Sequence, residues 1–136
     1  MQSKITDFIE RHHVMTLATS SELGVYCSNA FYAFNREAGA LIFTTNSETT
    51  RHGAEMRANP QVAVSIVLES KIVGKIQGAQ IVGRVEQAQG GDKEIYLKAF
   101  PYATFMPLEL WRVDIESVKL TDNTLGFGKK LIWNRE

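Results

Sequence analysis

Hydrophobic positions along the chain change their spacing several times, and each change marks an expected secondary-structure element. Ile5, Phe8 and Ile9 recur at helical spacing after Ser3, a suitable cap, so residues 4–12 are predicted to form a short amphipathic helix. Elsewhere, apolar residues alternate with smaller or polar ones, as they do in strands with one buried face. This alternation predicts strands over residues 62–68 and, as a last long strand, around residues 111–115. Further strands are predicted over residues 14–19, 25–34, 40–45 and 72–88, which are rich in β-forming residues or continue the run of strands after a loop.

Proline and glycine mark the ends of these segments. Pro60 ends a helix predicted over residues 48–58, and a further helix is predicted over residues 92–100, before Pro101. Three glycines interrupt the 72–88 segment, where bulges or sharp coiling would let a sheet close on itself. These are Gly74, Gly78 and Gly83.

Strands outnumber helices in this prediction and follow one another mostly as hairpins. The doubly wound α/β class needs a helix between nearly every pair of strands, so it is disfavoured. No internal repeat, low-complexity tract or linker divides the chain. We therefore expect a mainly β (α+β) fold in a single domain, residues 1–136: a small antiparallel barrel of six or seven strands with short helices at its ends.

Composition and charge exclude several classes of partner. The chain has 15 Lys and Arg against 15 Asp and Glu, so its net charge is zero and no basic field attracts nucleic acid. The first residues are polar where a signal peptide needs an apolar run, and no apolar stretch approaches the ~20 residues of a membrane span. The single cysteine, Cys27, cannot form an internal disulfide. We expect a cytoplasmic protein without nucleic-acid or membrane partners.

The segment from Leu41 to Ile66 has the chemistry of an anion site. Asn46 or Ser47 is expected to cap its helix, whose first turn has unpaired N–H groups and a partial positive charge. Arg51 and His52 lie at this turn, where each cation costs about 0.3–1 kcal/mol unless an anion binds the same N–H groups. The nearby hydroxyls that can converge on one phosphate belong to Thr44, Thr45, Ser47, Thr49 and Thr50.

A simpler interpretation of this segment is equally open. The threonines can be ordinary strand-end and capping residues, and Arg51 can be a solvated surface charge. Glu48 would then satisfy the helix dipole without any bound anion.

Other residues offer little support for a different chemistry. His12 and His13 are adjacent, so they point to different faces of a helix and cannot chelate one metal as an i, i+4 pair would. Cys27 has no sequence hint of an activating histidine and is interpreted as a small core residue. No Gly-x-Ser-x-Gly elbow occurs. Neither a zinc site nor a nucleophilic hydrolase is therefore expected.

The order of several segments resembles a known superfamily over nearly the whole chain. The segments are LATS, VYCSNAFYAF, LIFTT, TTRH, NPQVAVSI and IQGAQIVGRVE, and they resemble the FMN-binding split barrels related to pyridoxamine-phosphate oxidase. The C-terminal TDNTLGFGKKLIW, together with TRH and SNAFY, is most similar to the YhbP-like branch of small bacterial proteins, which has no assigned reaction. The fold implied is a six- to seven-stranded antiparallel split β-barrel with short flanking helices.

The resemblance implies a homodimer with two FMN sites at the subunit interface, each built from both chains. Thr44 and Thr45 then end the strand whose tip contacts the flavin, and Thr50 and Arg51 occupy the phosphate-binding turn. Oxidase relatives typically show Ser-Arg-Lys in that turn, so this chain keeps one cation and loses another. His52 is a candidate substitute for the missing cation.

Three neighbouring residues align with the strand beside the flavin ring, namely Asn29, Ala30 and Phe31. The resemblance implies that their backbone groups and the Asn29 amide bond the polar edge of the ring. The alternative for Asn29 is that its amide satisfies a neighbouring backbone group.

Two further expectations concern aromatic and basic residues near the C-terminus. Aromatic rings beside a split-barrel flavin can come from the second subunit, which makes Trp111 and Trp133 candidates, although ordinary core or dimer packing is favoured for both. Lys129 belongs to a glycine-flanked basic loop, Gly126 to Lys130, that would border the site and attract an anion. The alternative is a solvated lysine pair beside a turn.

The function expected from these residues is FMN binding with flavin-dependent redox chemistry on a small molecule. FMN carries the redox step, so the protein needs no acid or base of its own. Oxidation of pyridoxamine phosphate is disfavoured, because the C-terminal Arg-x-His element of those relatives has no match, and the lack of a C-terminal histidine also argues against the haem-degrading relatives. The alternatives are a non-catalytic flavin or small-ligand binding or sensor module, and an empty structural barrel.

Overall fold

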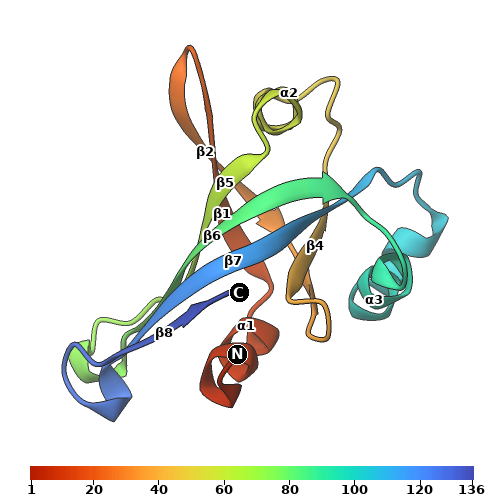
Figure 1. Ribbon diagram of the computed structural model, residues 1–136. Coiled ribbons are helices and arrows are strands. Elements are labelled where there is room, and N and C mark those ends of the chain that lie inside the picture. Colours follow the sequence, from red (N-terminus) through yellow and green to blue (C-terminus); the bar gives the residue numbers. More distant parts are fainter.

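The computed structural model describes residues 1–136 as one strongly curved antiparallel sheet with three α-helices around it (Figure 1). The α-helices are α1 (Ser3–Arg11), α2 (Arg51–Ala58) and α3 (Asp92–Ala99). The strands are β1 (Val14–Ser21), β2 (Gly24–Phe31), β3 (Ala33–Asn35), β4 (Ala40–Thr44), β5 (Gln61–Leu68), β6 (Gln77–Gln87), β7 (Leu110–Asp122) and β8 (Lys130–Asn134). Short 3-10 turns are η1 (Val73–Lys75), η2 (Pro101–Phe105) and η3 (Asn123–Leu125).

The strands follow the order β2-β1-β5-β6-β7-β4-β3, with β8 added beside β7. The long strand β7 therefore has three partners: it pairs with β6 along its length, with β4 near Trp111, and with β8 near Leu120. The sheet branches at β7, which places β4 and β8 at opposite ends of that strand.

The sheet curves until its two ends almost meet. β2 forms one edge, β3 forms the other, and only Tyr32 separates these two strands in the chain. Tyr32 is buried; its backbone N–H donates to the His13 carbonyl over 2.9 Å, and its hydroxyl donates to the Ile9 carbonyl over 2.7 Å. Burial raises the pKa of this phenol well above its usual range. The split of the barrel lies between β2 and β4, which are neighbours without strand pairing.

The hydrophobic core fills the inside of this curve. Buried and exposed residues alternate along β5 and β6, as predicted for strands with one core face. The helix α1 closes one end of the barrel with Ile5, Phe8 and Ile9, all fully buried, as its periodicity predicts. A smaller cluster lies under α3 and includes Tyr96 and Ile42. None of the helices is long and apolar enough to cross a membrane.

The mainly β split-barrel fold is confirmed, with eight strands instead of the six or seven predicted. The predicted strand 25–34 divides at Tyr32 into β2 and β3, and β8 follows the glycine-flanked loop near the C-terminus. The interpretation of Cys27 as a core residue is wrong: it is exposed, because β2 is an edge strand with most of both faces open to solvent.

The 72–88 segment is not one strand, because β6 begins only at Gln77. The chain before it turns through η1, which Asn123 holds by donating its side-chain amide to the Val73 carbonyl over 2.9 Å. Of the three glycines, Gly83 lies at a shift in register between β6 and β7: Val82 pairs with Ser117 and Gly83 with Ile115, so the extra residue is Glu116, on β7 and not on the glycine's own strand.

Candidate functional site

The turn before α2 differs in detail from the sequence prediction. Neither Asn46 nor Ser47 caps the helix; the cap is Thr50, whose Oγ1 accepts from the Gly53 backbone N–H over 3.1 Å. The Asn46 side chain instead accepts from the backbone N–H groups of Glu48 and Thr49, so the chain makes an extra turn before the helix. Arg51 is consequently the first residue of α2.

The hydroxyls of Thr45 and Thr50 and the imidazole of His52 lie close together at the start of α2. The Thr45 Oγ1 lies 2.6 Å from the His52 Nε2 and 3.3 Å from the Thr50 Oγ1. Burial lowers the pKa of His52, while the Glu55 carboxylate acts in the opposite direction. His52 is therefore neutral near pH 7 and contributes a hydrogen bond, where the sequence suggested a second cation.

Two backbone donors at this end of α2 have no partner. The N–H groups of Gly53 and Ala54 bond to Thr50, whereas those of Arg51 and His52 make no hydrogen bond within the chain. Free amides at a helix N-terminus carry partial positive charge and are available to an anion.

The Arg51 side chain is held by two groups. Its Nε donates to the Glu55 carboxylate over 3.2 Å, and its Cζ lies 4.3 Å from the centroid of the Tyr26 ring. The side chain of Arg51 remains 40% exposed, whereas that of Glu55 is 6% exposed. Sequence reasoning missed both partners, although the i, i+4 spacing of Arg51 and Glu55 on a predicted helix was an available signal.

Glu55 fixes α2 against the first hairpin of the sheet. Its carboxylate accepts from the Ser21 hydroxyl over 2.6 Å and from the Thr19 hydroxyl over 2.8 Å, in addition to Arg51. These hydrogen bonds, the one from Ser21 first, hold the pKa of Glu55 below its usual range. The carboxylate is therefore charged at neutral pH and balances the guanidinium of Arg51.

A second carboxylate, Glu109, fixes the other end of the turn. It accepts from the backbone N–H of Ser47 over 2.8 Å and from the Ser47 hydroxyl, and its backbone carbonyl accepts from the Thr44 hydroxyl over 2.9 Å. The Ser47 hydrogen bonds are the main cause of a lowered pKa at Glu109, with smaller contributions from the charge of Arg57 and from a hydrogen bond with the Trp111 side chain. Nothing in the sequence links Ser47 to Glu109, because the two are distant in the chain.

The structure brings five of the predicted site residues together at this turn: Thr44, Thr45, Thr50, Arg51 and His52. The predicted Asn29, Ala30 and Phe31 lie on β2, the edge strand that also carries Tyr26. Asn29 accepts from the Thr16 hydroxyl over 2.9 Å, and the half-exposed Phe31 ring lies 5.7 Å from that of Phe100. The site therefore faces the split, between β2 and the end of β4.

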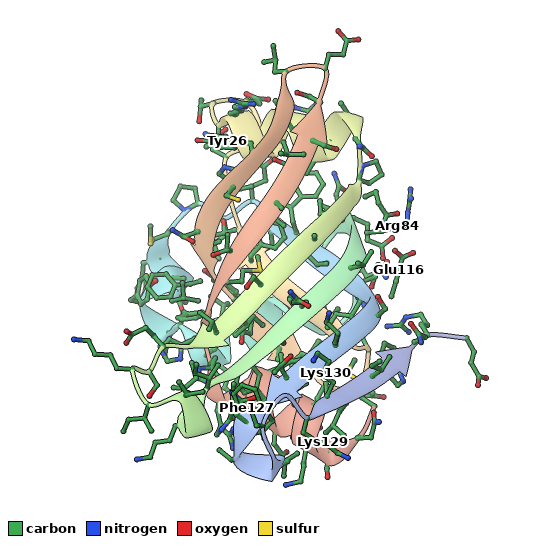
Figure 2. All side chains as sticks on the ribbon, turned by 90° about the vertical axis from the view of Figure 1, so that its left-hand side faces the viewer. Tyr26, Arg84, Glu116, Phe127, Lys129 and Lys130 are labelled. Carbon is green, nitrogen blue, oxygen red and sulfur yellow. The ribbon has the colours of Figure 1, made fainter.

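Of the last two predicted residues, Trp111 reaches the turn only through Glu109, and Lys129 does not join it within one chain. Trp111 is part of the main core at the start of β7. Lys129 lies past the other end of β7, where its carbonyl accepts from the Asp122 N–H over 2.9 Å. β7 has 13 residues, and an extended strand of 13 residues spans roughly 35–40 Å. Figure 2 shows Tyr26 at one end of the sheet and Lys129 at the other.

Comparison with known proteins shows the family of this fold. Residues 1–122 match the family model described as pyridoxamine 5'-phosphate oxidase. A UPF0306 protein of Photorhabdus laumondii is 38% identical over 132 residues, which cover 94% of this chain and 92% of that protein.

Solved structures share the fold at lower identity. A protein of Mesorhizobium loti described as FAD-binding superposes with a TM-score of 0.71 at 18% identity, covering 88% of this chain and 94% of that one. A haem-binding protein of Mycobacterium smegmatis superposes with a TM-score of 0.72 at 20% identity, covering 90% of this chain and 52% of that one. With the family match and the curated relative, these findings show that the chain belongs to the pyridoxamine 5'-phosphate oxidase-like split-barrel family, in its UPF0306 group.

Proposed function

We propose that this protein binds FMN, with the phosphate at the N-terminus of α2, and acts as a flavin-dependent oxidoreductase on a small molecule. The observation that carries the proposal is the pair of unpaired backbone N–H groups of Arg51 and His52, beside an exposed guanidinium. Two free amides, the positive end of a helix dipole and a cation on the same helical turn suit a phosphate dianion.

The residues present fit such a phosphate. The Thr50 hydroxyl donates to the Asn46 carbonyl over 2.7 Å and stays with the cap, whereas the Thr45 hydroxyl, 3.3 Å from Thr50 Oγ1, can turn to donate to a phosphate oxygen. His52 is neutral in the free protein, and an adjacent dianion would favour its protonated form. A protonated His52 would then replace the cation that the oxidase relatives carry at this turn.

The flavin ring would lie along the free edge of β2. There the backbone of Asn29, Ala30 and Phe31 and the Asn29 amide would hydrogen-bond the polar edge of the ring. Bound FMN would supply hydride or electron transfer, and the protein would hold and orient the ring and exclude water around it.

We further propose a homodimer, in which a second copy covers the outer face of the sheet seen in Figure 2. A shallow groove of about 540 Å³ crosses this face, lined by small and apolar residues such as Ala18, Ala63 and Val82. Lys129 of one copy would then border the flavin site of the other. We also propose a cytoplasmic location, where the single thiol, Cys27, stays reduced.

The dimer is tested by sedimentation equilibrium of the full chain. The change Val82→Glu puts a charge into the groove and should shift the protein to monomer. The change Leu23→Glu, at an exposed hairpin position outside the groove, is the control and should leave the mass unchanged. A monomeric wild-type protein would refute the dimer.

FMN binding is tested by titrating the full chain with FMN and following the quenching of flavin fluorescence. Arg51→Ala should weaken binding by about 1.5–3 kcal/mol, or roughly 10- to 150-fold in Kd, if the guanidinium bonds the phosphate. Arg57→Ala removes the same charge from an exposed position on the same helix and should change Kd little. Equal Kd values for wild type and Arg51→Ala would refute the proposal that the FMN phosphate binds at this turn.

A non-catalytic binding protein is the second candidate. It is favoured by the observation that both ionisable partners at the turn are engaged: His52 with Thr45, and Glu55 with three donors. Neither group is free to transfer a proton to a substrate. Stopped-flow oxidation of the reduced, FMN-loaded protein by candidate acceptors separates the two, because a binder gives no acceleration over free FMN.

The absorption spectrum of the purified protein also tests the cofactor. The fold is shared with proteins described as FAD-binding and as haem-binding, so the chromophore that copurifies is informative. A flavin spectrum supports the proposal, whereas a haem Soret band would show that the protein binds haem and would refute FMN as its cofactor.

A further inference from the structure

Two loops form a projecting tip at one end of the sheet, past the ends of β6, β7 and β8 and on the other side of the molecule from α3 (Figure 1). One loop, residues 71–76, contains η1, and the other, residues 123–130, contains η3. Asn123 joins them: its backbone N–H donates to the Ile76 carbonyl over 3.0 Å, and its side-chain amide donates to the Val73 carbonyl over 2.9 Å. The two loops are therefore held together as one unit, the η1–η3 tip.

Three apolar side chains of the η1–η3 tip are exposed to solvent. Phe127 is 87% exposed, and Ile72 and Val73 are each more than half exposed. Phe127 lies between Gly126 and Gly128, whose φ angles of 133° and 72° favour glycine. A Cβ at either glycine would meet nothing within 4 Å, so Phe127 is held where its backbone has open space around it. Single exposed apolar residues are common on proteins, but three on two joined loops make a patch.

Exposed lysines accompany this apolar patch. The tip contains no acidic residue and four lysines, none of which forms an ion pair: Lys71, Lys75, Lys129 and Lys130. The flanking acids are Glu69 and Asp122, and Asp122 is buried and accepts from the Thr124 backbone N–H over 2.9 Å. Even with both flanking acids included, this end of the molecule has an excess of positive charge, although the whole chain is neutral. Figure 2 shows Phe127, Lys129 and Lys130 gathered there.

Apolar side chains that project from a cationic loop fit the surface of an anionic lipid membrane. Aromatic and aliphatic side chains enter the boundary between headgroups and acyl chains, while lysines stay at the level of the anionic headgroups. A stable protein interface uses about 20–30 residues on each side, which is more than these two loops hold. The size and the charge of the tip therefore favour a lipid surface over a protein partner.

We propose that the η1–η3 tip attaches this protein to membranes that contain anionic lipids. Its apolar residues enter the headgroup boundary, and Lys71, Lys75 and Lys130 pair with anionic headgroups. Lys129, proposed to border the flavin site of a second copy, is not required for this attachment. No residue of the tip lines the groove proposed for that second copy, so the dimer and the membrane contact use different residues.

Peripheral attachment of this kind is compatible with a neutral chain. The expectation of no membrane partner was based on the net charge and on the lack of a long apolar segment. Neither property bears on a local tip, because at physiological salt only charges within about 8 Å of the surface act strongly. The proposed cytoplasmic location supplies a suitable surface, since the cytoplasmic leaflet carries anionic lipids.

Co-sedimentation of the full chain with lipid vesicles, in the absence of FMN, tests the proposal. Vesicles of phosphatidylcholine with phosphatidylserine should bind the protein, and vesicles of phosphatidylcholine alone should bind it roughly 10- to 100-fold less tightly. Added salt should release the protein, since salt screens the lysines. Because no flavin is present, the result does not depend on cofactor binding at the α2 turn.

Variants at Phe127 test the apolar contact. Phe127→Ser should weaken binding to the anionic vesicles about 10-fold or more, because it removes the most exposed apolar side chain of the tip. Phe127→Trp should bind at least as tightly as wild type, since tryptophan suits the membrane interface. Phe105→Ser changes an equally exposed aromatic residue outside the tip and is the control.

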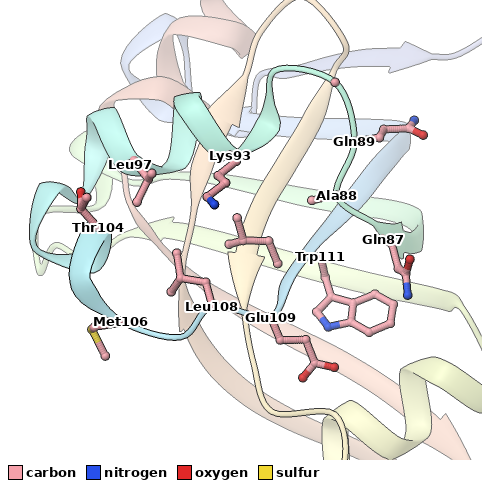
Figure 3. Close-up of a pocket in the computed structure, with 12 residues that line it drawn as sticks. Gln87, Ala88, Gln89, Lys93, Leu97, Thr104, Met106, Leu108, Glu109 and Trp111 are labelled. Carbon is pink, nitrogen blue, oxygen red and sulfur yellow. The ribbon is translucent and has the colours of Figure 1, made fainter.

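A double variant tests the charge. Lys71→Ala together with Lys75→Ala should weaken binding to the anionic vesicles roughly 20-fold, about fivefold for each cation near the surface. The control is Lys93→Ala together with Lys98→Ala, which removes the same charge from exposed positions on α3. Figure 3 shows Lys93 extending from α3 over a pocket that is separate from the tip.

Several outcomes would overturn the membrane contact. Absence of binding to vesicles with phosphatidylserine is the first. Equal binding by wild type and Phe127→Ser would mean that the lysines attract any anionic surface without insertion. Equal binding by wild type and the Lys71 and Lys75 double variant would mean that the charge of the tip plays no part. If Phe127→Ser turns a dimeric protein into a monomer in sedimentation equilibrium, the tip contacts a second copy and not a lipid surface.

Discussion

The guanidinium of Arg51 lies over the ring of Tyr26, with 4.3 Å between Cζ and the ring centroid. This contact joins the N-terminus of α2 to the edge strand β2 across the split of the barrel. The Nε of Arg51 donates to the Glu55 carboxylate. The two terminal nitrogens of the Arg51 guanidinium therefore remain free as donors. The ring and the carboxylate thus orient Arg51 while leaving it able to bond an anion.

Removing the ring should therefore weaken FMN binding without removing any phosphate contact. A cation–π contact at an exposed site contributes about 0.5–1 kcal/mol, so Tyr26→Ala should raise the Kd for FMN roughly two- to fivefold. Tyr26→Phe keeps the aromatic face and should bind FMN as wild type does. Fluorescence titration of both variants measures the effect. If Tyr26→Phe and Tyr26→Ala weaken FMN binding equally, the contribution of Tyr26 comes from its hydroxyl and not from its ring.

Glu55 should make the stability of the protein depend on pH. Its pKa in the folded protein is lowered from the ordinary 4.5, chiefly by the Ser21 and Thr19 hydroxyls. A carboxylate whose folded pKa is depressed stabilises the protein above its unfolded pKa, and that contribution is lost as the pH falls below about 4.5. Glu55→Gln should lower Tm at pH 7, and its difference from wild type should shrink toward pH 3.

Thermal denaturation from pH 3 to pH 7 measures this difference. Glu48→Gln is the matched control, since Glu48 is exposed and bonds through its backbone N–H alone. It should give a small difference from wild type that does not change with pH. A Glu55→Gln difference that stays constant down to pH 3 would mean that the charge of Glu55 contributes nothing.

Much of the fold could be predicted because its elements follow from local patterns. The alternation along β5 and the helical spacing of Ile5, Phe8 and Ile9 each depend on one buried face, which the sequence displays directly. The register shift at Gly83 was predictable because a glycine within a strand often marks a bulge or a close approach of backbones, although the extra residue lies on the paired strand β7. The threonines and Arg51 were predictable as one turn because they are close in the chain.

The parts that were missed depend on contacts between distant residues. The strand around residues 25–34 divides because the buried Tyr32 bonds back to His13 and Ile9, and nothing nearby in the sequence encodes those partners. Tyr26, on β2, and Glu109, just before β7, reach the turn from distant parts of the chain in the same way. The helix cap was placed wrongly because Asn46 and Thr50 are both good capping residues, and tertiary contacts decided between them.

His52 offers a test of the phosphate position that does not rely on mutation. Burial lowers the pKa of His52 in the free protein, so its imidazole signal should titrate with a midpoint below 6.5. A phosphate dianion beside the ring would favour the imidazolium and raise that midpoint. NMR titrations of the His52 ring protons, without ligand, with inorganic phosphate and with FMN, measure the change. A midpoint that neither ligand moves would place the phosphate away from His52.

Gly83 provides a test of the bulge that shapes the sheet. A Cβ at this position would lie 2.5 Å from the backbone oxygen of Asp114 and 2.7 Å from a Val113 methyl carbon, so β7 must shift to admit it. Overpacking of this kind costs about 1–3 kcal/mol, and Gly83→Ala should lower Tm by about 3–10 °C. Gly74→Ala is the control, because a Cβ there meets nothing within 4 Å. Its Tm should equal or slightly exceed that of wild type, since alanine reduces the entropy of the unfolded chain.

Calorimetry of the two variants side by side measures both Tm values. Equal Tm values for Gly83→Ala and Gly74→Ala would show that β6 and β7 adjust freely at the bulge.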